Sequence, residues 1–443
     1  MNARAVALGI WSLGLAYATE ARAGNDDGVL VGNRAAMVGG AVAATVDDAS
    51  SIWYNPGGLG SVQRAQIDVS GTVYAGRLYI VPEFIAVEGG PSKRAMVSEF
   101  LTVPAQVAFA RELKPGVTLG LGYFAPQAAS FVLREELDVG NERAGSRWQV
   151  TATSSEIQHI FAAAVGGSAQ KGLRLGLGLN AGYQLTAETV SVFGEAHENF
   201  ATQGAANQSV VVTSTRLSAE TVLGLQWDAA RTLTLGLTLR SPRMLLRETK
   251  ESSFAFSTAS GSGDPDAQSG VTSSFYGKLR RLKAGRIAIG FAYHYAGGYL
   301  SAEIDAQPGL EEADVQVHRR AFANARFGLY HALTRALAVG VGVFSDRAPE
   351  AETPGLLSAR GDFYGATSGI ELSNEHFLAP SERVKSLIFN SVIALRYAFS
   401  QGDFGETVVD PERLSTGEAA FRTVQSDIVV HEFALYVGSG LKF

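Results

Sequence analysis

Parts of this sequence alternate apolar residues with small or polar ones, which is the pattern of a β-strand with one apolar face. From Leu173 to Leu185, every second residue is Leu, Ala or Tyr, and the residues between them are Arg, Gly, Asn or Gln. The same alternation recurs over 233–240, 286–295 and 337–344. A strand of this kind suits the wall of a membrane barrel, which has lipid on one side and a polar lumen on the other.

The composition limits how such strands can enter a membrane. Beyond the first two dozen positions there is no run of about eighteen apolar residues, so we expect no transmembrane helix. Glycine makes up 50 of the 443 residues, 46% of residues are hydrophobic, and cysteine is missing. Because every backbone group in lipid must be paired within the protein, these features favour a closed β-barrel. The net charge of −6 argues against a nucleic-acid partner.

The first 23 residues have the pattern of a secretory signal peptide. Met1 to Arg4 carries positive charge, Ala5 to Ala18 is apolar, and Ala21-Arg22-Ala23 offers the small residues that signal peptidase requires. The alternative is an N-terminal helix that merely has a similar composition. We expect residues 1–23 to be removed after export to the periplasm.

The predicted strands have short connections at one end and long connections at the other. Lys114-Pro115-Gly116 is a tight connection, whereas 250–272 and 401–429 are long and polar; the connection 374–385 breaks the rule. Outer-membrane barrels segregate their loops in this way, and a soluble β-sandwich has no reason to do so. We therefore predict an all-β fold, a transmembrane antiparallel β-barrel of about 14 strands over residues 63–443. The strands are predicted near 65–75, 102–113, 117–127, 154–168, 172–192, 209–229, 231–249, 273–296, 298–306, 318–331, 335–346, 364–373, 386–400 and 430–443.

The last predicted strand ends in phenylalanine. Phe433, Leu435, Val437, Leu441 and the terminal Phe443 share one face. Such an ending is similar to the signal that the barrel-assembly machinery reads in outer-membrane proteins. The predicted location is therefore the outer membrane of a Gram-negative bacterium.

Residues 24–62 do not alternate and precede the barrel. Asp47 and Asp48 stand where a carboxylate can cap a short helix that runs to Tyr54. Asn55 and Pro56 then end this helix, since proline cannot continue it and Asn favours turns. The segment is rich in Ala and Gly and carries little charge, so we predict a small, partly helical hatch that plugs the lumen.

The run GNRAAMVGGAVAATVDDASSIWYNPGGLG resembles the hatch of the FadL/TodX family of outer-membrane transporters for hydrophobic compounds. Three later segments are similar to strands of that family: LTLGLTLRSP (233–242), RFGLYHALTRALAVGVGVFSDRAPE (326–350) and GDFYGATSGIEL (361–372). Gly57 departs from the family pattern, which usually has alanine there. The positions that carry the hatch motif are Asp47, Asp48, Asn55, Pro56, Gly58 and Leu59.

The resemblance implies passive uptake of hydrophobic compounds, with long-chain fatty acids as the expected substrate. In that family the ligand binds among the extracellular loops, passes a hatch and leaves sideways at a kinked third strand. Here the kinked strand corresponds to Val117–Gln127, with Phe124 and Pro126 near the opening. The expected partners are a hydrophobic small molecule, the lipid bilayer and, through Phe443, the barrel-assembly machinery.

Two sets of residues are candidates for ligand binding. Aromatic residues in the connection after the seventh strand either form an apolar landing groove or belong to the aromatic girdle at the membrane edge; these are Phe254, Phe256, Phe275 and Tyr276. Inward-facing arginines either hold a ligand carboxylate or pair with acids of the lumen; these are Arg174, Arg240, Arg286 and Arg326.

The sequence lacks the motifs of an enzyme or a metal site. There is no Gly-x-Ser-x-Gly, no His-Glu-x-x-His and no phosphate-binding glycine loop, and the seven histidines have no ligand-like spacing. We therefore predict no catalytic residue, no cofactor and no metal. The alternatives that stay open are a docking protein of a secretion system with the same fold and, less favoured, an outer-membrane lipid hydrolase. An open porin fits less well because a plug obstructs solute flow.

Overall fold

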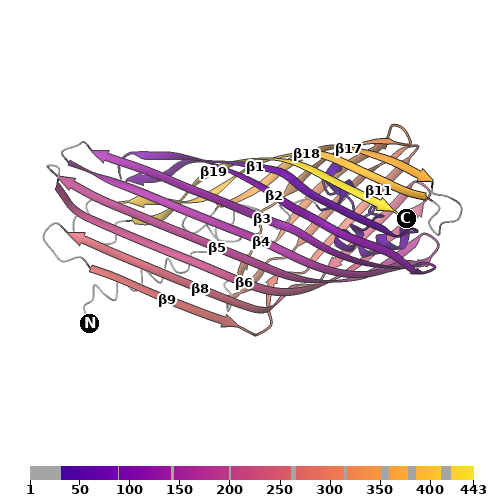
Figure 1. The fold of residues 1–443 in the computed structure, drawn as a ribbon, viewed down its shortest axis with the longest axis horizontal. Helices are drawn as coiled ribbons and strands as arrows, with labels where there is room; N and C mark the ends of the chain where they lie inside the picture. Colours follow the sequence, from indigo (N-terminus) through magenta and orange to yellow (C-terminus); the bar gives the residue numbers. More distant parts are fainter. Residues whose placement is uncertain are drawn as a thin grey trace.

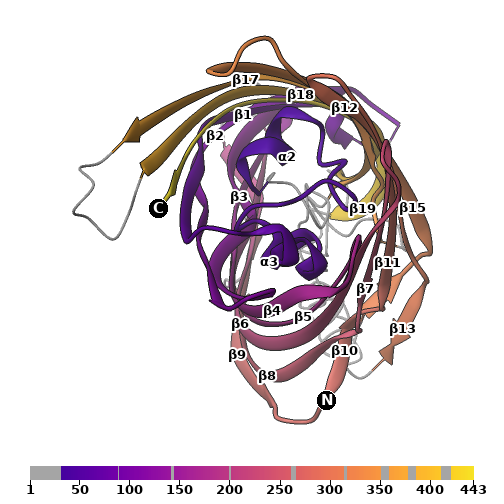
Figure 2. The same cartoon turned by 90° about the vertical axis from the view of Figure 1, so that its right-hand side faces the viewer.

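The chain folds into a closed antiparallel barrel of 14 strand passes, as the alternation predicted. A computed structural model describes residues 31–87, 89–140, 144–198, 201–260, 266–313, 317–350, 359–377, 386–410 and 421–443. The signal peptide predicted over 1–23 lies outside these residues. Figure 1 shows the long tilted strands of the wall, and Figure 2 shows the ring that they form.

The strands alternate in direction around the ring. β1 pairs antiparallel with β2 on one edge and with β19 on the other, so the first and last strands close the sheet. The strands are β1 (Gln66–Val87), β2 (Ser92–Lys114), β3 (Val117–Gly140), β4 (Ala144–Gln170), β5 (Leu173–Glu198), β6 (Ala201–Ala230), β7 (Leu233–Arg240), β8 (Arg243–Ser260), β9 (Asp266–Tyr276), β10 (Arg280–Lys283), β11 (Arg286–Tyr295), β12 (Gly298–Gln307), β13 (Leu310–Glu312), β14 (Val317–Arg319), β15 (Phe322–Ala332), β16 (Leu337–Asp346), β17 (Ala359–Phe377), β18 (Ser386–Val409) and β19 (Phe421–Lys442).

Some passes of the wall are divided into shorter strands. Ser241 and Pro242 separate β7 from β8, because proline cannot donate to a β-ladder. Both halves nevertheless pair with β6 and together make the seventh pass. The return pass consists of β9 and β10, which pair with β8, and β11, which pairs with β7.

Most strands extend further toward the long-loop end than the sequence predicted. The region 250–272, expected as a loop, contributes to β8 and β9, and β6 begins at Ala201 rather than near 209. The boundary near 374 was also wrong, because β17 runs to Phe377 and pairs there with Ser386 of β18. The extensions of β6, β8 and β9 are rich in Ser, Thr, Gln and Ala, so they lack the apolar alternation on which the prediction depended.

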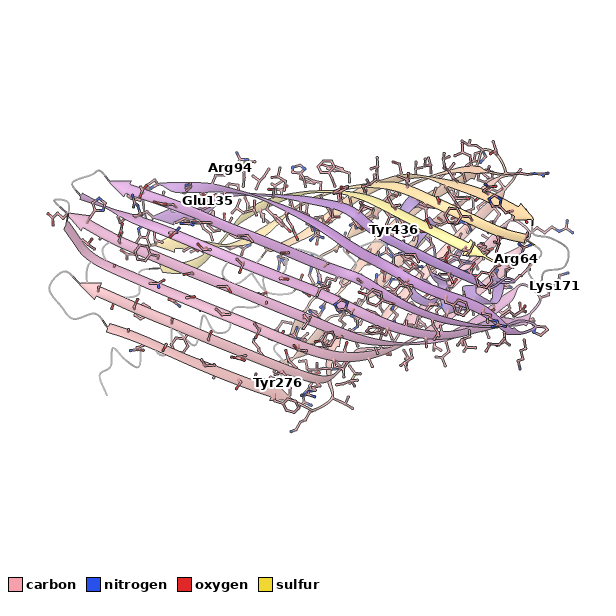
Figure 3. All side chains as sticks on the ribbon, in the orientation of Figure 1. Arg64, Arg94, Glu135, Lys171, Tyr276 and Tyr436 are labelled. Atoms are coloured by element: carbon pink, nitrogen blue, oxygen red, sulfur yellow. The ribbon has the colours of Figure 1, made fainter. Side chains whose placement is uncertain are left out.

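The tight turns gather at one end of the barrel, which we call the short-turn end. Gly116, Gly172 and Gly297 adopt positive φ angles of 78°, 79° and 91° in three of these turns, a conformation that glycine reaches without steric cost. The C-terminus lies at the same end (Figure 1). Arg64 and Lys171 lie near this end, and Arg94 and Glu135 lie toward the other (Figure 3).

The outer face of the barrel is apolar and the inner face is largely polar. Leu177, Phe291 and Val341 point outward and are 57%, 43% and 49% exposed. Thr234 and Thr238, which alternate with leucines on β7, are buried inside. An outer face of this kind matches the hydrocarbon layer of a bilayer.

Residues 31–62 lie inside the ring of strands near the short-turn end, and we call them the lumen segment (Figures 1 and 2). They form the helices α2 (Asn33–Met37) and α3 (Ser51–Tyr54) and the 3₁₀ helix η1 (Pro56–Ser61). The short helix at Tyr54 and the turn at Asn55 thus occur where the sequence predicted them. Among the helices described, none has the length and apolar character needed to span a bilayer.

Candidate functional site: the lumen segment and the wall around it

The Asn55 side chain forms hydrogen bonds with two positions of the lumen segment and with one strand of the wall. Its amide nitrogen donates to the carbonyl oxygen of Ala43 at 2.7 Å and to that of Leu225 on β6 at 2.9 Å. Its Oδ1 accepts a hydrogen bond from the backbone nitrogen of Gly57 at 3.0 Å. The side chain is fully buried. Asn55 therefore fixes the turn before η1 and attaches it to the barrel wall.

Other wall side chains bind the backbone of the lumen segment directly. Glu303 of β12 accepts hydrogen bonds from the backbone nitrogens of Val42 and Ala43 at 3.0 and 2.8 Å. Asp68 of β1 accepts one from Ala49 at 3.1 Å. Further wall donors reach carbonyl groups that have no partner within a helix: Gln226 to Val46, Thr238 to Tyr54, and Thr367 to Met37. The wall thus satisfies polar groups that burial would otherwise leave unpaired.

Glycines on the inner face allow the lumen segment to approach the strands closely. A Cβ atom at Gly176 of β5 would overlap the backbone of Pro56, and one at Gly224 of β6 would overlap the Asn55 side chain. The sequence identified this face as small or polar and gave no sign of what packs on it. Other glycines where a Cβ would meet the lumen segment are Gly120, Gly166, Gly236, Gly290, Gly328, Gly340, Gly342, Gly369 and Gly438.

The same close packing applies to the NPGGL motif itself. A Cβ at Gly58 would overlap the carbonyl oxygen of Val46. At Gly57, where the resembling family usually has alanine, it would lie 3.1 Å from the backbone of Arg174 and Gln226. Leu59 is fully buried in an apolar cluster with side chains of α3 and of the wall strands β2, β3 and β4. The glycine at 57 therefore belongs to a tight contact with the wall.

Asp47 and Asp48 have different environments. Asp47 forms an ion pair of 2.8 Å with Arg34, whose Nε lies 3.4 Å from Glu371 of β17. Burial alone would raise the pKa of Asp47, but the Arg34 guanidinium holds it below its usual range. Burial and the neighbouring Asp47 carboxylate raise the pKa of Asp48. Asp48 accepts a hydrogen bond from the backbone nitrogen of Ser50 at 2.9 Å, just before α3.

All four predicted lumen arginines face inward, and each is paired with a wall carboxylate. Arg174 lies 2.6 Å from Asp228, and it also bonds the Ser61 hydroxyl at the end of η1. Arg240 lies 3.0 Å from Glu220, donates to the carbonyl oxygen of Trp53, and stacks over the Trp53 ring at 4.6 Å. These two arginines are therefore attached to the lumen segment.

The other two predicted arginines share an acidic pair on β12. Arg286 binds Asp305, and Arg326 lies 2.9 Å from Glu303 and 3.5 Å from Asp305. Glu303 is the residue that also holds the Val42 and Ala43 nitrogens. Glu303, which Arg326 binds, therefore also supports the lumen segment.

The predicted aromatic groove is divided between two faces of the wall. Phe254 and Phe256 lie on β8, and Phe275 and Tyr276 lie on β9, so all four are strand residues and none is in a loop. Tyr276 pairs with the buried Glu248. Phe275 is on the opposite face, 62% exposed, with the Arg247 guanidinium 5.2 Å above its ring. The structure therefore does not bring the four rings together.

Phe124 connects the lumen segment to the third strand. It is fully buried and its ring lies 5.5 Å from that of Trp53, between ring centroids. One step further along β3, the ladder to β4 is interrupted between Phe124 and Gln127. Ala125 and Pro126 together face one residue of β4, which is a β-bulge. Beside the predicted opening, the structure therefore has a kinked strand in contact with α3.

The ladder between β2 and β3 ends at this bulge. Gln106 and Phe124 are the last partners, although β2 continues on β1 to Ser92 and β3 continues on β4 to Gly140. If the register continued, Pro104 would stand opposite Pro126. Neither proline has a backbone N–H to donate, so this position cannot carry the ladder further. The described wall therefore has a break in its backbone ladder between these strands, which the Glu99 and Lys93 side chains of β2 span by bonding the Ser130 nitrogen and the Glu136 carbonyl oxygen of β3.

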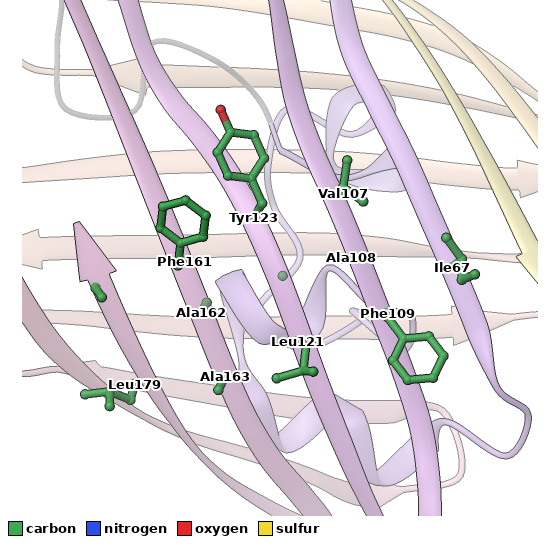
Figure 4. Close-up of a pocket in the computed structure, with 12 residues that line it drawn as sticks. Ile67, Val107, Ala108, Phe109, Leu121, Tyr123, Phe161, Ala162, Ala163 and Leu179 are labelled. Atoms are coloured by element: carbon green, nitrogen blue, oxygen red, sulfur yellow. The ribbon is translucent and has the colours of Figure 1, made fainter. Parts of the chain in front are cut away.

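A groove lies on the outer face of the wall beside this break (Figure 4). It has a volume of about 660 Å³ and is formed by outward side chains of β1 to β5. Figure 4 shows Val107 and Phe109 on one side, and Tyr123 and Phe161 on the other. The Tyr123 hydroxyl bonds His159 at 2.7 Å and provides a polar point in an otherwise apolar surface.

Further from the short-turn end, the lumen changes from polar to apolar. On the inner face of β1, Asp68 holds the lumen segment, Ser70, Thr72 and Arg77 follow, and Tyr79 and Val81 come after them. Arg77 lies 2.7 Å from Glu432 and belongs to an ion-pair layer. Beyond this layer is an apolar cluster whose largest members are Tyr79, Phe84, Trp148, Phe344, Phe363 and Phe404. A solute moving through the lumen must therefore contact apolar side chains.

Among the described residues, no group of three or more His, Asp and Glu side chains could hold a metal ion. The features that sequence analysis missed are contacts between distant segments: the glycines around the lumen segment, and the acidic partners Glu220, Glu303 and Asp305. The end of the β2–β3 ladder at Gln106 and Phe124 was also missed. Only the acids could have been found from the sequence, because they fall on the inner face of predicted strands that neighbour the strands of the arginines.

Solved structures with the same fold extend over almost the whole chain. A FadL homologue of Pseudomonas aeruginosa has 11% sequence identity, a TM-score of 0.61, and coverage of 94% of this chain and 99% of that one. The toluene transporter TodX of Pseudomonas putida has 13% identity, a TM-score of 0.52, and coverage of 96% and 99%. The toluene transporter TbuX of Ralstonia pickettii has 10% identity, a TM-score of 0.50, and coverage of 93% and 98%. No protein-family model and no curated protein matches the sequence.

Proposed function

We propose that this chain, which has the fold of the FadL and TodX transport proteins, is an outer-membrane channel for passive uptake of hydrophobic compounds. Export through the signal peptide 1–23 and recognition of Phe443 by the barrel-assembly machinery are part of this proposal. The lumen segment acts as its hatch. The observation that carries the proposal is the break between β2 and β3, which lies between a buried aromatic contact and an outer apolar groove.

The proposed path avoids a continuous aqueous pore. A hydrophobic molecule enters from the long-loop end, passes the apolar cluster, and reaches Phe124 above α3. It leaves between β2 and β3, where the backbone ladder has already ended and the Glu99 side chain bonds Ser130, and enters lipid along the outer groove. Apart from the ion-pair layer at Arg77, apolar surface stays covered by apolar groups along this path, so most of the cost of exposing the molecule to water is avoided.

Uptake by cells tests the function directly. Cells that lack their own transporter receive either this barrel or none, and the entry of labelled hexadecane, toluene and a long-chain fatty acid is compared. Barrel-dependent entry of at least one of them is expected. If a correctly inserted barrel transports none, the transport function is wrong, and docking of exported cargo becomes the function to test.

Deletion of Pro126 tests the lateral path. On β3 the inward residues have even numbers up to Phe124 and odd numbers from Leu133, because the bulge adds one residue. Removing Pro126 therefore gives a regular strand that keeps Leu133 inside. We expect barrel-dependent uptake to fall by about tenfold or more, which corresponds to about 1.4 kcal/mol in the barrier.

The matched control is Pro126→Ala, which keeps the extra residue and hence the bulge. Its uptake should stay near that of the unmodified protein. Heat-modifiable migration of the folded barrel in gels shows whether each variant has assembled. Unchanged uptake by an assembled deletion variant would rule out exit between β2 and β3.

A further inference from the structure

The charges in the lumen indicate which hydrophobic molecules the barrel accepts. A ligand with a carboxylate needs a cation that is not already neutralised, because an unpaired charge is costly to bury. The arginines predicted for this role are bound to Asp228, Glu220, Asp305 and Glu303. A carboxylate ligand would have to compete with each of these built-in acids.

The ion-pair layer below the apolar cluster is internally balanced. Arg77 lies 2.7 Å from Glu432 and 3.8 Å from Glu99, and Arg396 lies 3.3 Å from Glu432. The Tyr79 hydroxyl donates to Glu99 at 2.8 Å. All four charged side chains are less than a tenth exposed. Two guanidiniums thus face two carboxylates, and a third carboxylate would give the layer a net negative charge.

Elsewhere in the interior, buried carboxylates also bind the nearby arginines. Arg216, Arg240 and Arg286 are paired with the buried Glu248, Glu220 and Asp305. Glu406 is buried on β18 beside Phe404, a member of the apolar cluster. An added anion would meet these carboxylates beside arginines that are already paired, and at short range in a low-dielectric interior the repulsion from a carboxylate is strong.

We infer that the ligand of this barrel is an uncharged hydrophobic molecule, and that the lumen discriminates against its carboxylated analogue. The inference rests on the proposed transport function and narrows its substrate class from hydrophobic compounds in general to neutral ones. The apolar cluster supplies the contact surface, and the ion-pair layer supplies the discrimination against anions.

Matched pairs of labelled compounds test this discrimination. Cells with and without the barrel are given hexadecane or hexadecanoate, and toluene or benzoate, at pH 8, where the carboxylates are ionised. Barrel-dependent entry of each hydrocarbon should exceed that of its acid by about tenfold or more, or about 1.4 kcal/mol. If the acid enters as well as the hydrocarbon, the inference is wrong and transport stands. If no compound depends on the barrel, the transport function itself fails.

Glu432→Gln provides a gain-of-function test. It removes one carboxylate from the ion-pair layer and leaves Arg77 and Arg396 with Glu99 alone, so the layer gains a net positive charge. The ratio of acid to hydrocarbon uptake should rise about tenfold. Glu99→Gln makes the same change in charge from β2 and serves if Glu432→Gln does not assemble.

The matched control is Asp138→Asn, which makes the same carboxylate-to-amide change at the exposed ion pair with Arg147. Its uptake ratio should not change. An assembled Glu432→Gln or Glu99→Gln barrel with the ratio of the unmodified protein would overturn the assignment of anion discrimination to the ion-pair layer.

Discussion

Gly176→Ala should release the lumen segment from the wall by about 2 kcal/mol, the usual cost of overpacking a tight contact. The added methyl group would overlap backbone atoms of Pro56 and lie 2.7 Å from the backbone nitrogen of Gly57. Backbone atoms cannot move aside as a flexible side chain does. Since alanine is a better strand residue than glycine, the strand itself should not be weakened.

A single cysteine makes this release measurable, because the chain has none of its own. Ser51 is fully buried in α3, and its hydroxyl has no hydrogen-bond partner among the described residues. Ser51→Cys is therefore a conservative reporter that a maleimide reaches only when the lumen segment leaves its place. With Gly176→Ala in the same chain, the rate of labelling should rise roughly thirtyfold, the equivalent of about 2 kcal/mol.

Gly178→Ala is the matched control on the same strand and face. A Cβ at that position would lie 3.4 Å from Pro56 Cγ and 3.5 Å from Ala164 Cβ, which are ordinary contacts. Labelling should then stay within about twofold of the reporter alone. Equal rates for the two alanine variants would mean that close packing against β5 does not hold the lumen segment in place.

These glycines illustrate how far the sequence could predict the structure. Alternation over 173–185 predicted the strand and assigned Gly176 to the inner face, because the period of a strand depends on local residues alone. It gave no reason for glycine rather than serine or threonine at that position. The reason is the backbone of Pro56, more than a hundred residues away in the sequence, and no local pattern encodes such an approach.

The arginines show the same division between local and distant information. Alternation correctly placed Arg240 and Arg326 inside, but it left open whether they bind a ligand or a lumen acid. Glu303 and Arg326 turn out to be direct neighbours across β12 and β15. This ion pair could have been predicted from the sequence if the register of the two predicted strands had been known. The contact of Arg240 with Trp53 could not, because it joins the wall to the lumen segment.

The strand ends were the least predictable part of the fold. Toward the long loops, the residues of β6 and β8 are mostly Ser, Thr, Gln and Ala. Beyond the bilayer the outer face of a barrel has no need to be apolar, so the alternation disappears while the ladder continues. Phe254 was therefore assigned to a loop although its backbone pairs with Val210 and Gly270.

Asn55→Ala should weaken the docking of the lumen segment by more free energy than the loss of an exposed hydrogen bond would. The substitution leaves the carbonyl oxygens of Ala43 and Leu225 without this donor, and the Gly57 nitrogen without its acceptor. The Ala43 carbonyl keeps a donor in Gln226 at 3.3 Å, whereas a buried group left unpaired costs about 1–3 kcal/mol, so we expect docking to weaken by about 2–4 kcal/mol in total. Labelling of the Ser51→Cys reporter should rise accordingly, by about thirtyfold or more.

The functional consequence of Asn55→Ala should be a leak. Once the lumen segment is displaced, water and ions can enter the short-turn end, so the ion conductance of the barrel in a planar bilayer should increase while hydrocarbon uptake falls. Asn55→Asp keeps the shape of the side chain but turns its donor into an acceptor, so its carboxylate would face two carbonyl oxygens. It should be at least as disruptive as alanine.

Asn374→Ala, at an exposed position of β17, controls for the loss of an amide and should change neither labelling nor conductance. If Asn55→Asp kept the labelling rate of the reporter alone, the hydrogen bonds of Asn55 would not hold the hatch. The glycine contacts would then have to hold it by packing alone. Because Asn55→Asp removes hydrogen bonds without adding volume and Gly176→Ala adds volume without removing hydrogen bonds, the two variants separate these contributions.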